Sequence, residues 1–547
     1  MTPFWYQLVR EKDGTLMGLD KIKLSLDCDI SDFRKAVKAE NAVKLKEVDA
    51  SDLTVYSNMD AYKNRATVSH LKPSAPVSGG DSEENALVVL VPSKVIGDNE
   101  MNHQLSSFWA SLSQSDPKDC CLHFNEIPPF FPDGMTSLLI RKSYSDLFDI
   151  MLSNLIKGMH RMAITGNPGI GKSVFLFYIL WRLSTNSNAE TVILRRQKDS
   201  GQIYIFQKGS AWMTRDDNKI MKLLYSPRTW YLTDTLDPTP GEVKAVTVLV
   251  ASPARRHYKV FLKYSSTAPL HYLPVWSLEE LLSVRGQFSL TQQLVEERFC
   301  QIGGIPRFVL EKNKEDLTKI VKKAISRLSI EKFDSIAAGD AERDDEISHL
   351  VVHYGVNATY DDISLCMGSS VITDLALDRF LKSQETSLKR FLAYTDSTSL
   401  LASLRGNLFE AYAHRLLSGG GNFKVRSLDE DKQHEISIPP LSTIRFYDIS
   451  ICKNEKYYIP WNPNYPCIDS FIPTRHLFQM TVSMEHPIKL DPMLDIMRKT
   501  KISDLIFVVP IALYDNFKIQ RLDMGSEKAM KKLKLEVKQY VLGIEIT

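Results

Sequence analysis

The chain has 547 residues, of which 44% are hydrophobic and 24% are charged, so it is too long for one hydrophobic core and too apolar to be disordered. Its 68 lysines and arginines nearly balance its 66 aspartates and glutamates, which excludes binding of nucleic acid or membrane through the field of the whole chain. The seven cysteines are scattered and form no CxxC pair, which argues against a disulfide framework and a cysteine zinc site.

We expect three or four domains that work in a reducing, intracellular environment. Charges from Arg10 to Lys12 precede any stretch that could form the core of a signal peptide, and no apolar run is long enough to span a membrane. The expected protein is therefore soluble, without membrane contact and without a classical secretory signal.

Residues 1–71 predict a small N-terminal domain. A strand, a turn at Asp13-Gly14 and a second strand precede a helix at 31–41, whose Phe33 and Val37 fall on one face. This order suits a ubiquitin-like β-grasp fold.

Residues 72–85 predict a linker, because two prolines, two glycines and small polar side chains cannot bury enough apolar surface to order themselves. The apolar run at 86–91 predicts a buried strand, which stops at Pro92. We assign it to a connecting segment at 86–135.

The segment GNPGIGKS satisfies the GxxxxGK[ST] pattern of a phosphate-binding loop. Apolar residues at 162–165 predict a strand before it, and the run at 174–183 predicts a helix after it, so phosphate would sit on the N-terminus of that helix. Lys172 would reach the β and γ phosphates, and the Ser173 hydroxyl would ligate Mg²⁺. A chance glycine turn is the alternative, but the order strand, loop, helix favours nucleotide binding. The predicted nucleotide contacts are Gly166, Asn167, Pro168, Gly169, Ile170, Gly171, Lys172 and Ser173.

A second strand at 230–234 ends in Asp234, as the Mg²⁺ shell of a P-loop enzyme requires. We predict that Asp234 and Ser173 bind the metal and that Asp234 and Lys172 are catalytic. The alternative is that the strand merely ends in an ordinary turn at Asp234 to Pro238. AAA+ and STAND-like NTPases place another acid directly after this aspartate, whereas this chain has Thr235, with Asp237 as the nearest acid.

The strand predicted at 246–253 brings Ser252 to the carboxyl edge of the sheet, where ligand contacts lie. Arg255 and Arg256 follow this strand. Either one of them acts as an arginine finger or both lie in a solvated loop. The NTPase domain is assigned to 136–300.

The sequence GGIPR at 303–307 resembles the element that follows the nucleotide domain in STAND-related ATPases. The resemblance implies that Arg307 senses the γ-phosphate, although a simple turn explains the glycines and the proline equally well. A helical extension is assigned to 301–400.

The last domain is assigned to 401–547. Glu410 on a predicted helix, Asp469 on one strand and Gln479 on the next resemble the PD-(D/E)xK nuclease fold. This resemblance implies that Glu410 and Asp469 bind Mg²⁺ and that Gln479 completes the catalytic site. The family has an acid and a lysine where this chain has Gln479 and Thr481, so an active nuclease and a nucleic-acid-binding platform both stay open.

Several segments resemble Crinkler proteins. ALVVLVP at 86–92 is similar to the HVLVVVP motif near the end of the ubiquitin-like N-terminal domain in that family, with Ala86 in place of the histidine. The segments at 127–149, 273–282 and 303–308 resemble the NTPase core that Crinklers share with retrotransposon hot spot proteins. The resemblance implies a secreted effector that works in the nucleus of a host cell.

The residues and the resemblance together predict a multidomain α/β effector: a ubiquitin-like β-grasp domain, an AAA+/STAND-like P-loop NTPase with a helical extension, and a PD-(D/E)xK-like module acting on DNA. The expected cofactors are ATP or GTP and Mg²⁺, and the expected partners are DNA, host proteins and further copies of the chain. A lysine cluster could contact phosphates or direct nuclear import, or could simply be a solvated helix face: Lys528, Lys531, Lys532, Lys534 and Lys538. The competing hypothesis is a nucleotide-switched signalling or scaffold protein whose last module only binds.

Overall fold

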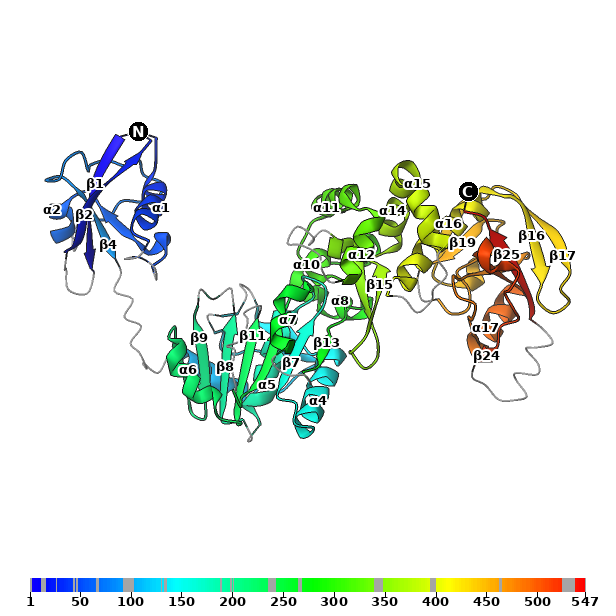
Figure 1. Ribbon diagram of the computed structural model, residues 1–547, viewed down its shortest axis with the longest axis horizontal. Coiled ribbons are helices and arrows are strands. Elements are labelled where there is room, and N and C mark those ends of the chain that lie inside the picture. Colours follow the sequence, from blue (N-terminus) through cyan, green and yellow to red (C-terminus); the bar gives the residue numbers. More distant parts are fainter. Residues whose placement is uncertain are drawn as a thin grey trace. The chain divides into compact units, whose positions relative to one another are not determined.

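The computed structural model describes residues 2–10, 16–25, 27–42, 45, 48–64, 68–91, 103–128, 130–131, 135–186, 189–196, 199, 201–234, 243–263, 268–338, 348–393, 400–461, 465–523 and 537–546. The chain forms two compact units, Met1–Glu100 and Met101–Thr547. Both units combine helices with sheets, which confirms the predicted mixed α/β class (Figure 1). Among the described residues, no helix is both long and apolar enough to cross a membrane.

The first unit is a four-stranded sheet with helices. Its elements are β1 (Thr2–Arg10), β2 (Leu16–Leu24), α1 (Ile30–Glu40), β3 (Thr54–Tyr56), α2 (Met59–Lys63) and β4 (Leu87–Val91). The strand order is β2-β1-β4-β3, with β1 antiparallel to β2 and parallel to β4. Asp29 caps α1 by accepting the Asp32 N–H, and Phe33 and Val37 are buried as predicted.

Residues 72–91 belong to this unit, which differs from the predicted linker. The Val77 N–H donates to the Cys28 carbonyl at 3.2 Å, and the Trp5 N–H donates to the Gly80 carbonyl at 2.7 Å. Gly80 has a φ of +76°, and an added Cβ would lie 2.8 Å from the Trp5 carbonyl oxygen. The small residues that suggest a flexible linker therefore allow a close return to the sheet. β4 completes the core of the first unit, so the boundary between units falls after it.

The first part of the second unit is built around a seven-stranded sheet. Its elements are α3 (His103–Leu112), β5 (Cys121–His123), β6 (Ser137–Leu139), α4 (Lys142–Ile156), β7 (Arg161–Thr165), α5 (Lys172–Ser184), β8 (Thr191–Arg196), β9 (Ile203–Gln207), β10 (Ser210–Thr214), α6 (Asp217–Leu224), β11 (Thr229–Asp234), β12 (Val246–Val250), α7 (Lys259–Lys263) and β13 (Leu270–Tyr272). The order is β10-β9-β8-β11-β12-β7-β13, with the last five strands parallel. Helices lie on both faces: Leu232 shares a core with α5, and its neighbour Tyr231 shares another with α6. Residues at the carboxyl ends of β7, β11 and β12 therefore meet at one edge.

A mainly helical region follows. Its elements are α8 (Leu278–Val284), α9 (Gln292–Ile302), α10 (Pro306–Val309), α11 (Lys314–Arg327), α12 (Ile330–Ala338), α13 (Ser348–Val351), β14 (Val352–Val356), β15 (Ile363–Met367), α14 (Ser370–Ser383) and α15 (Glu385–Ala393). The antiparallel hairpin β14–β15 adds two strands to the helical extension predicted at 301–400. Its turn is closed by Asn357, whose side chain donates to Thr359 and Asp361. The mostly apolar segment at 350–356 is too short to distinguish a strand from a helix by its pattern.

The C-terminal part contains an eight-stranded sheet. Its elements are α16 (Ala402–Gly419), β16 (Gly421–Ser427), β17 (Gln433–Ile438), β18 (Thr443–Phe446), β19 (Tyr457–Pro460), β20 (Ser470–Ile472), β21 (His476–Met480), β22 (Ile488–Lys489), α17 (Leu490–Thr500), β23 (Asp504–Pro510), α18 (Ile511–Tyr514), β24 (Leu522–Asp523) and β25 (Lys538–Ile544). The order is β17-β16-β25-β23-β21-β20-β19-β18. α16 packs with one face of the sheet, and α17 packs with the other. Lys538 begins β25, and the other four lysines of the predicted cluster lie outside the described residues.

Candidate functional site

The GNPGIGKS motif forms the connection between β7 and α5, as the sequence predicts. Gly166 has a φ of +150°, and an added Cβ would lie 2.5 Å from the carbonyl oxygen of Leu273. Gly171 precedes α5 with a φ of +96°, and an added Cβ would lie 2.9 Å from the Tyr144 hydroxyl oxygen. Both positions therefore require glycine for conformation and for space.

The side chain of Lys172 folds over the loop. Its Nζ donates to the carbonyl oxygens of Gly166 at 2.7 Å and Asn167 at 2.8 Å. Burial lowers the pKa of Lys172 to about 7, the Asp234 carboxylate opposes this shift, and the Arg307 guanidinium adds to it. An anion beside this ammonium group would raise its pKa again, so binding of phosphate would stabilise the charged lysine.

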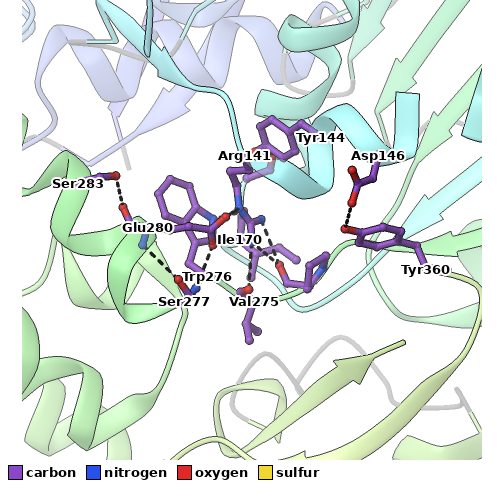
Figure 2. A network of polar contacts seen from close by, with 12 residues as sticks. Arg141, Tyr144, Asp146, Ile170, Val275, Trp276, Ser277, Glu280, Ser283 and Tyr360 are labelled. Carbon is purple, nitrogen blue, oxygen red and sulfur yellow. Dashed lines mark hydrogen bonds and ion pairs between the residues drawn. The ribbon is translucent and has the colours of Figure 1, made fainter. Parts of the chain in front are cut away.

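Side chains from two distant segments hold other carbonyls of the loop (Figure 2). Trp276 Nε1 donates to the Ile170 carbonyl at 2.8 Å, and the Tyr144 hydroxyl donates to the Gly171 carbonyl at 3.1 Å. In the part of the chain that the structure describes, no hydrogen bond occupies the N–H groups of Gly169, Ile170 or Gly171. The loop thus has its acceptors engaged and its donors available, which suits an anionic ligand.

Arg141 connects these two segments. Its buried guanidinium donates to the carbonyls of Pro274 and Val275 and to both carboxylate oxygens of Glu280, at 2.9 to 3.1 Å. It also lies 5.1 Å from the ring centroid of Trp276. We call Arg141, Tyr144, Trp276 and Glu280 the brace. Beyond the family resemblance of its two segments, no sequence pattern indicates the brace, because its members meet only in the fold.

The two predicted Mg²⁺ ligands of the NTPase are neighbours. The Ser173 hydroxyl donates to Asp234 Oδ2 at 2.5 Å. Ser173 lies in the first turn of α5, and Asp234 is the last residue of β11. A hydroxyl and a carboxylate are oxygen ligands that Mg²⁺ prefers. Thr235 and Asp237 lie outside the described residues, so the role considered for Asp237 stays a prediction.

Ser252 follows β12 at the same edge of the sheet. Its hydroxyl is hydrogen-bonded to Nδ1 of His257, a partner that no sequence pattern indicates. Arg255 and Arg256 lie in an exposed turn, which fits the solvated-loop interpretation. The role of Ser252 as a nucleotide contact stays a prediction.

The GGIPR segment packs against the loop. The Arg307 N–H approaches the Gly169 carbonyl at 3.4 Å. The Trp276 N–H donates to the Gly304 carbonyl at 2.8 Å, and an added Cβ at Gly304 would lie 1.9 Å from the Trp276 carbonyl oxygen. The fold therefore places Arg307 beside the loop and joins its segment to the brace.

The three predicted residues of the C-terminal site also come together. Gln479 Nε2 donates to Asp469 Oδ2 at 2.7 Å, and the Met480 N–H donates to the same oxygen at 2.6 Å. Glu410 Oε1 lies 3.4 Å from Nε2 of His414, one turn along α16.

The carboxyl groups of this site influence each other. Burial, together with the charge of Glu410, raises the pKa of Asp469 to about 8. Burial likewise raises the pKa of Glu410 to about 7, which Arg445 opposes and Asp374 reinforces. Burial therefore favours the protonated form of both carboxyl groups.

A further polar chain reaches this site. His414 Nδ1 lies 2.9 Å from the Tyr457 hydroxyl, which lies 2.7 Å from the Ser470 hydroxyl. Burial lowers the pKa of His414 to about 4, so the ring is neutral at neutral pH. His414 lies four residues after Glu410, and this spacing is the sequence signal that could have indicated their contact on one helix face. Among the described residues, no group of three or more His, Cys, Asp and Glu side chains could hold a metal, so the second Mg²⁺ site stays a prediction.

The fold and these sites define a multidomain α/β protein with a P-loop motif and a separate buried carboxylate site. No protein-family model matches the chain. The chain is 28% identical over 460 residues to Crinkler effector protein 15 of Phytophthora infestans, a match that covers 80% of this chain and 74% of that protein. It is also 28% identical over 460 residues to Crinkler effector protein 16 of the same organism, covering 73% of that protein. These matches support a distant relationship to the Crinkler family.

Proposed function

We propose that this protein binds and hydrolyses a nucleoside triphosphate, ATP or GTP, at the loop between β7 and α5. The contact between Ser173 and Asp234 is the observation that carries the proposal, because it pairs two metal ligands beside the loop lysine. The neighbouring parallel strands β7, β12 and β11 support the proposal further, since open α/β sheets bind ligands at the carboxyl ends of such strands.

Each residue has a distinct role in this proposal. Water would attack the γ-phosphate and break its phosphoanhydride bond, releasing phosphate, and Mg²⁺ would neutralise charge on the phosphate oxygens. The loop N–H groups bind phosphate oxygens, and Lys172 adds a cation that burial has left weakly solvated. Ser173 and Asp234 would hold the metal, and Arg307 would contribute a second cation next to the loop.

We further propose that the protein is a Crinkler-type effector in which the NTPase controls the C-terminal module. The names of its relatives support the effector role, and delivery into a host cell with work in its nucleus follows from the family resemblance. In the active form of this proposal, Glu410, Asp469 and Gln479 would hold Mg²⁺, and the metal would activate water to hydrolyse a phosphodiester bond of DNA.

A second candidate is a nucleotide-controlled platform whose C-terminal module binds nucleic acid or protein without cleavage. The environment of Asp469 favours this candidate, since one of its oxygens already accepts two hydrogen bonds and its pKa is raised to about 8. A protonated carboxyl group is a poor Mg²⁺ ligand.

One experiment separates the candidates. Purified full-length protein is incubated with ATP or GTP, Mg²⁺ and supercoiled plasmid, and phosphate release and plasmid nicking are scored separately. Phosphate release together with plasmid nicking supports the nuclease, provided that Asp469→Ala abolishes the nicking. Release without nicking supports the platform, and no release with either nucleotide refutes the NTPase.

A further inference from the structure

Asn167 does not serve the loop alone. Its side chain is fully buried, and Nδ2 donates to the carbonyls of His349 and Val352, both at 2.9 Å. Its Oδ1 accepts the N–H of Tyr354 at 2.9 Å. Both N–H groups and the carbonyl of the amide are thus committed to the segment that contains α13 and β14. The phosphate-binding loop is fastened to this hairpin by three hydrogen bonds.

The other strand of the hairpin is fastened in the same way. Val352 on β14 pairs directly with Met367 on β15. The Met367 N–H donates to Oδ1 of Asn407 on α16 at 3.0 Å. Two asparagine side chains therefore hold the same cross-strand pair, Asn167 from the loop and Asn407 from the C-terminal helix.

Asn407 lies on the helix that carries the carboxylate site. Glu410 and His414 follow it by three and seven residues, so all three lie on one face of α16. One cross-strand pair and two side-chain contacts therefore connect the P-loop to the turn that precedes Glu410.

We propose that Asn167 and Asn407 are positioning residues through which the nucleotide state of the P-loop controls the carboxylate site on α16. This inference rests on the proposed nucleotide binding. A shift of the loop on binding of phosphate must move the hairpin or break the three bonds of a buried amide, and breaking them would be costly. The hairpin passes this displacement to α16 through Asn407.

The test uses full-length protein with and without ATP and Mg²⁺. Hydrogen exchange of α16 and nucleotide affinity by calorimetric titration are measured for the wild type and for Asn407→Ala. We expect ATP to change the exchange rate in α16 of the wild type by about two- to tenfold, the contribution of one hydrogen bond. We expect Asn407→Ala to abolish this change and, because coupling is reciprocal, to alter ATP affinity by a similar factor.

Two further variants provide the controls. Asn407→Asp keeps an acceptor for the Met367 N–H and should restore ATP affinity toward that of the wild type. Ser418→Ala removes a hydroxyl that donates to the Arg415 carbonyl within the same helix, and it should leave both readouts unchanged.

The outcomes separate this inference from the proposed function. If the wild type binds ATP and exchange in α16 does not respond, the hairpin is a rigid connection and the inference is overturned, while nucleotide binding stands. The same conclusion holds if Asn407→Ala responds to ATP as the wild type does. If calorimetry detects no ATP binding to the wild type, the proposed function and the inference both fail.

Discussion

Gly166→Ala should destabilise the second unit and abolish nucleotide hydrolysis. At the φ of +150° found at this position, a residue with a Cβ carries about 1–3 kcal/mol of backbone strain. The added methyl group would also lie 2.5 Å from the Leu273 carbonyl oxygen, and overpacking of this kind costs about 1–3 kcal/mol. The expected loss in the free energy of unfolding is therefore about 2–6 kcal/mol.

The assay is urea unfolding followed by tryptophan fluorescence, with Gly158→Ala as the matched control. Gly158 also has a positive φ, of +81°, but an added Cβ would meet nothing within 4 Å. The control should therefore show backbone strain alone, about 1–2 kcal/mol, and should retain hydrolysis. Equal unfolding midpoints for the two variants would refute the argument that the Leu273 carbonyl leaves no space for a side chain at position 166.

Three further variants test the two sites. Asp234→Asn should lower turnover more than nucleotide affinity in steady-state and binding assays, because it changes the metal shell rather than the phosphate contacts; a loss confined to affinity would count against the metal role. The pKa of Asp469 is raised from the ordinary 3.8 to about 8, so in this pH range the folded state keeps a proton that the unfolded state loses. This group therefore makes the free energy of unfolding fall as the pH rises through that window. Asp469→Asn should flatten that fall in urea unfolding between about pH 5 and 8, and an unchanged slope would contradict the raised pKa. Gln479→Glu should strengthen Mg²⁺ or Mn²⁺ binding at the C-terminal site by about tenfold or more in calorimetry, and unchanged binding would show that Gln479 is not a ligand.

The P-loop was predictable because its residues are contiguous and its flanking apolar runs fix the strand and the helix. Asp234 was predictable for a similar reason, since a polar residue that ends a buried parallel strand must lie at the ligand edge of the sheet. Glu410, Asp469 and Gln479 were found only through family resemblance, and the structure brings them together. A local pattern therefore determines where the loop, its strand and its helix lie, while the roles of these residues stay predictions.

The brace and the hairpin could not be predicted in this way. Arg141 meets Glu280 only because the fold brings their segments to the same side of the loop. The hairpin at 352–367 has short apolar strands that fit a helical region equally well by pattern. Residues 72–85 have the composition of a linker, and their order comes from tertiary hydrogen bonds that no local propensity encodes.

The most direct test of nucleotide hydrolysis at the P-loop compares phosphate release by the wild type, Lys172→Ala and Lys208→Ala at saturating ATP and Mg²⁺. Lys172 is buried and bonded to the loop, whereas Lys208 is an exposed lysine in the turn between β9 and β10. We predict that Lys172→Ala lowers turnover by about a hundredfold or more with an unchanged circular dichroism spectrum, and that Lys208→Ala matches the wild type. Turnover by a folded Lys172→Ala protein equal to that of the wild type would contradict the assignment of this loop as the nucleotide site.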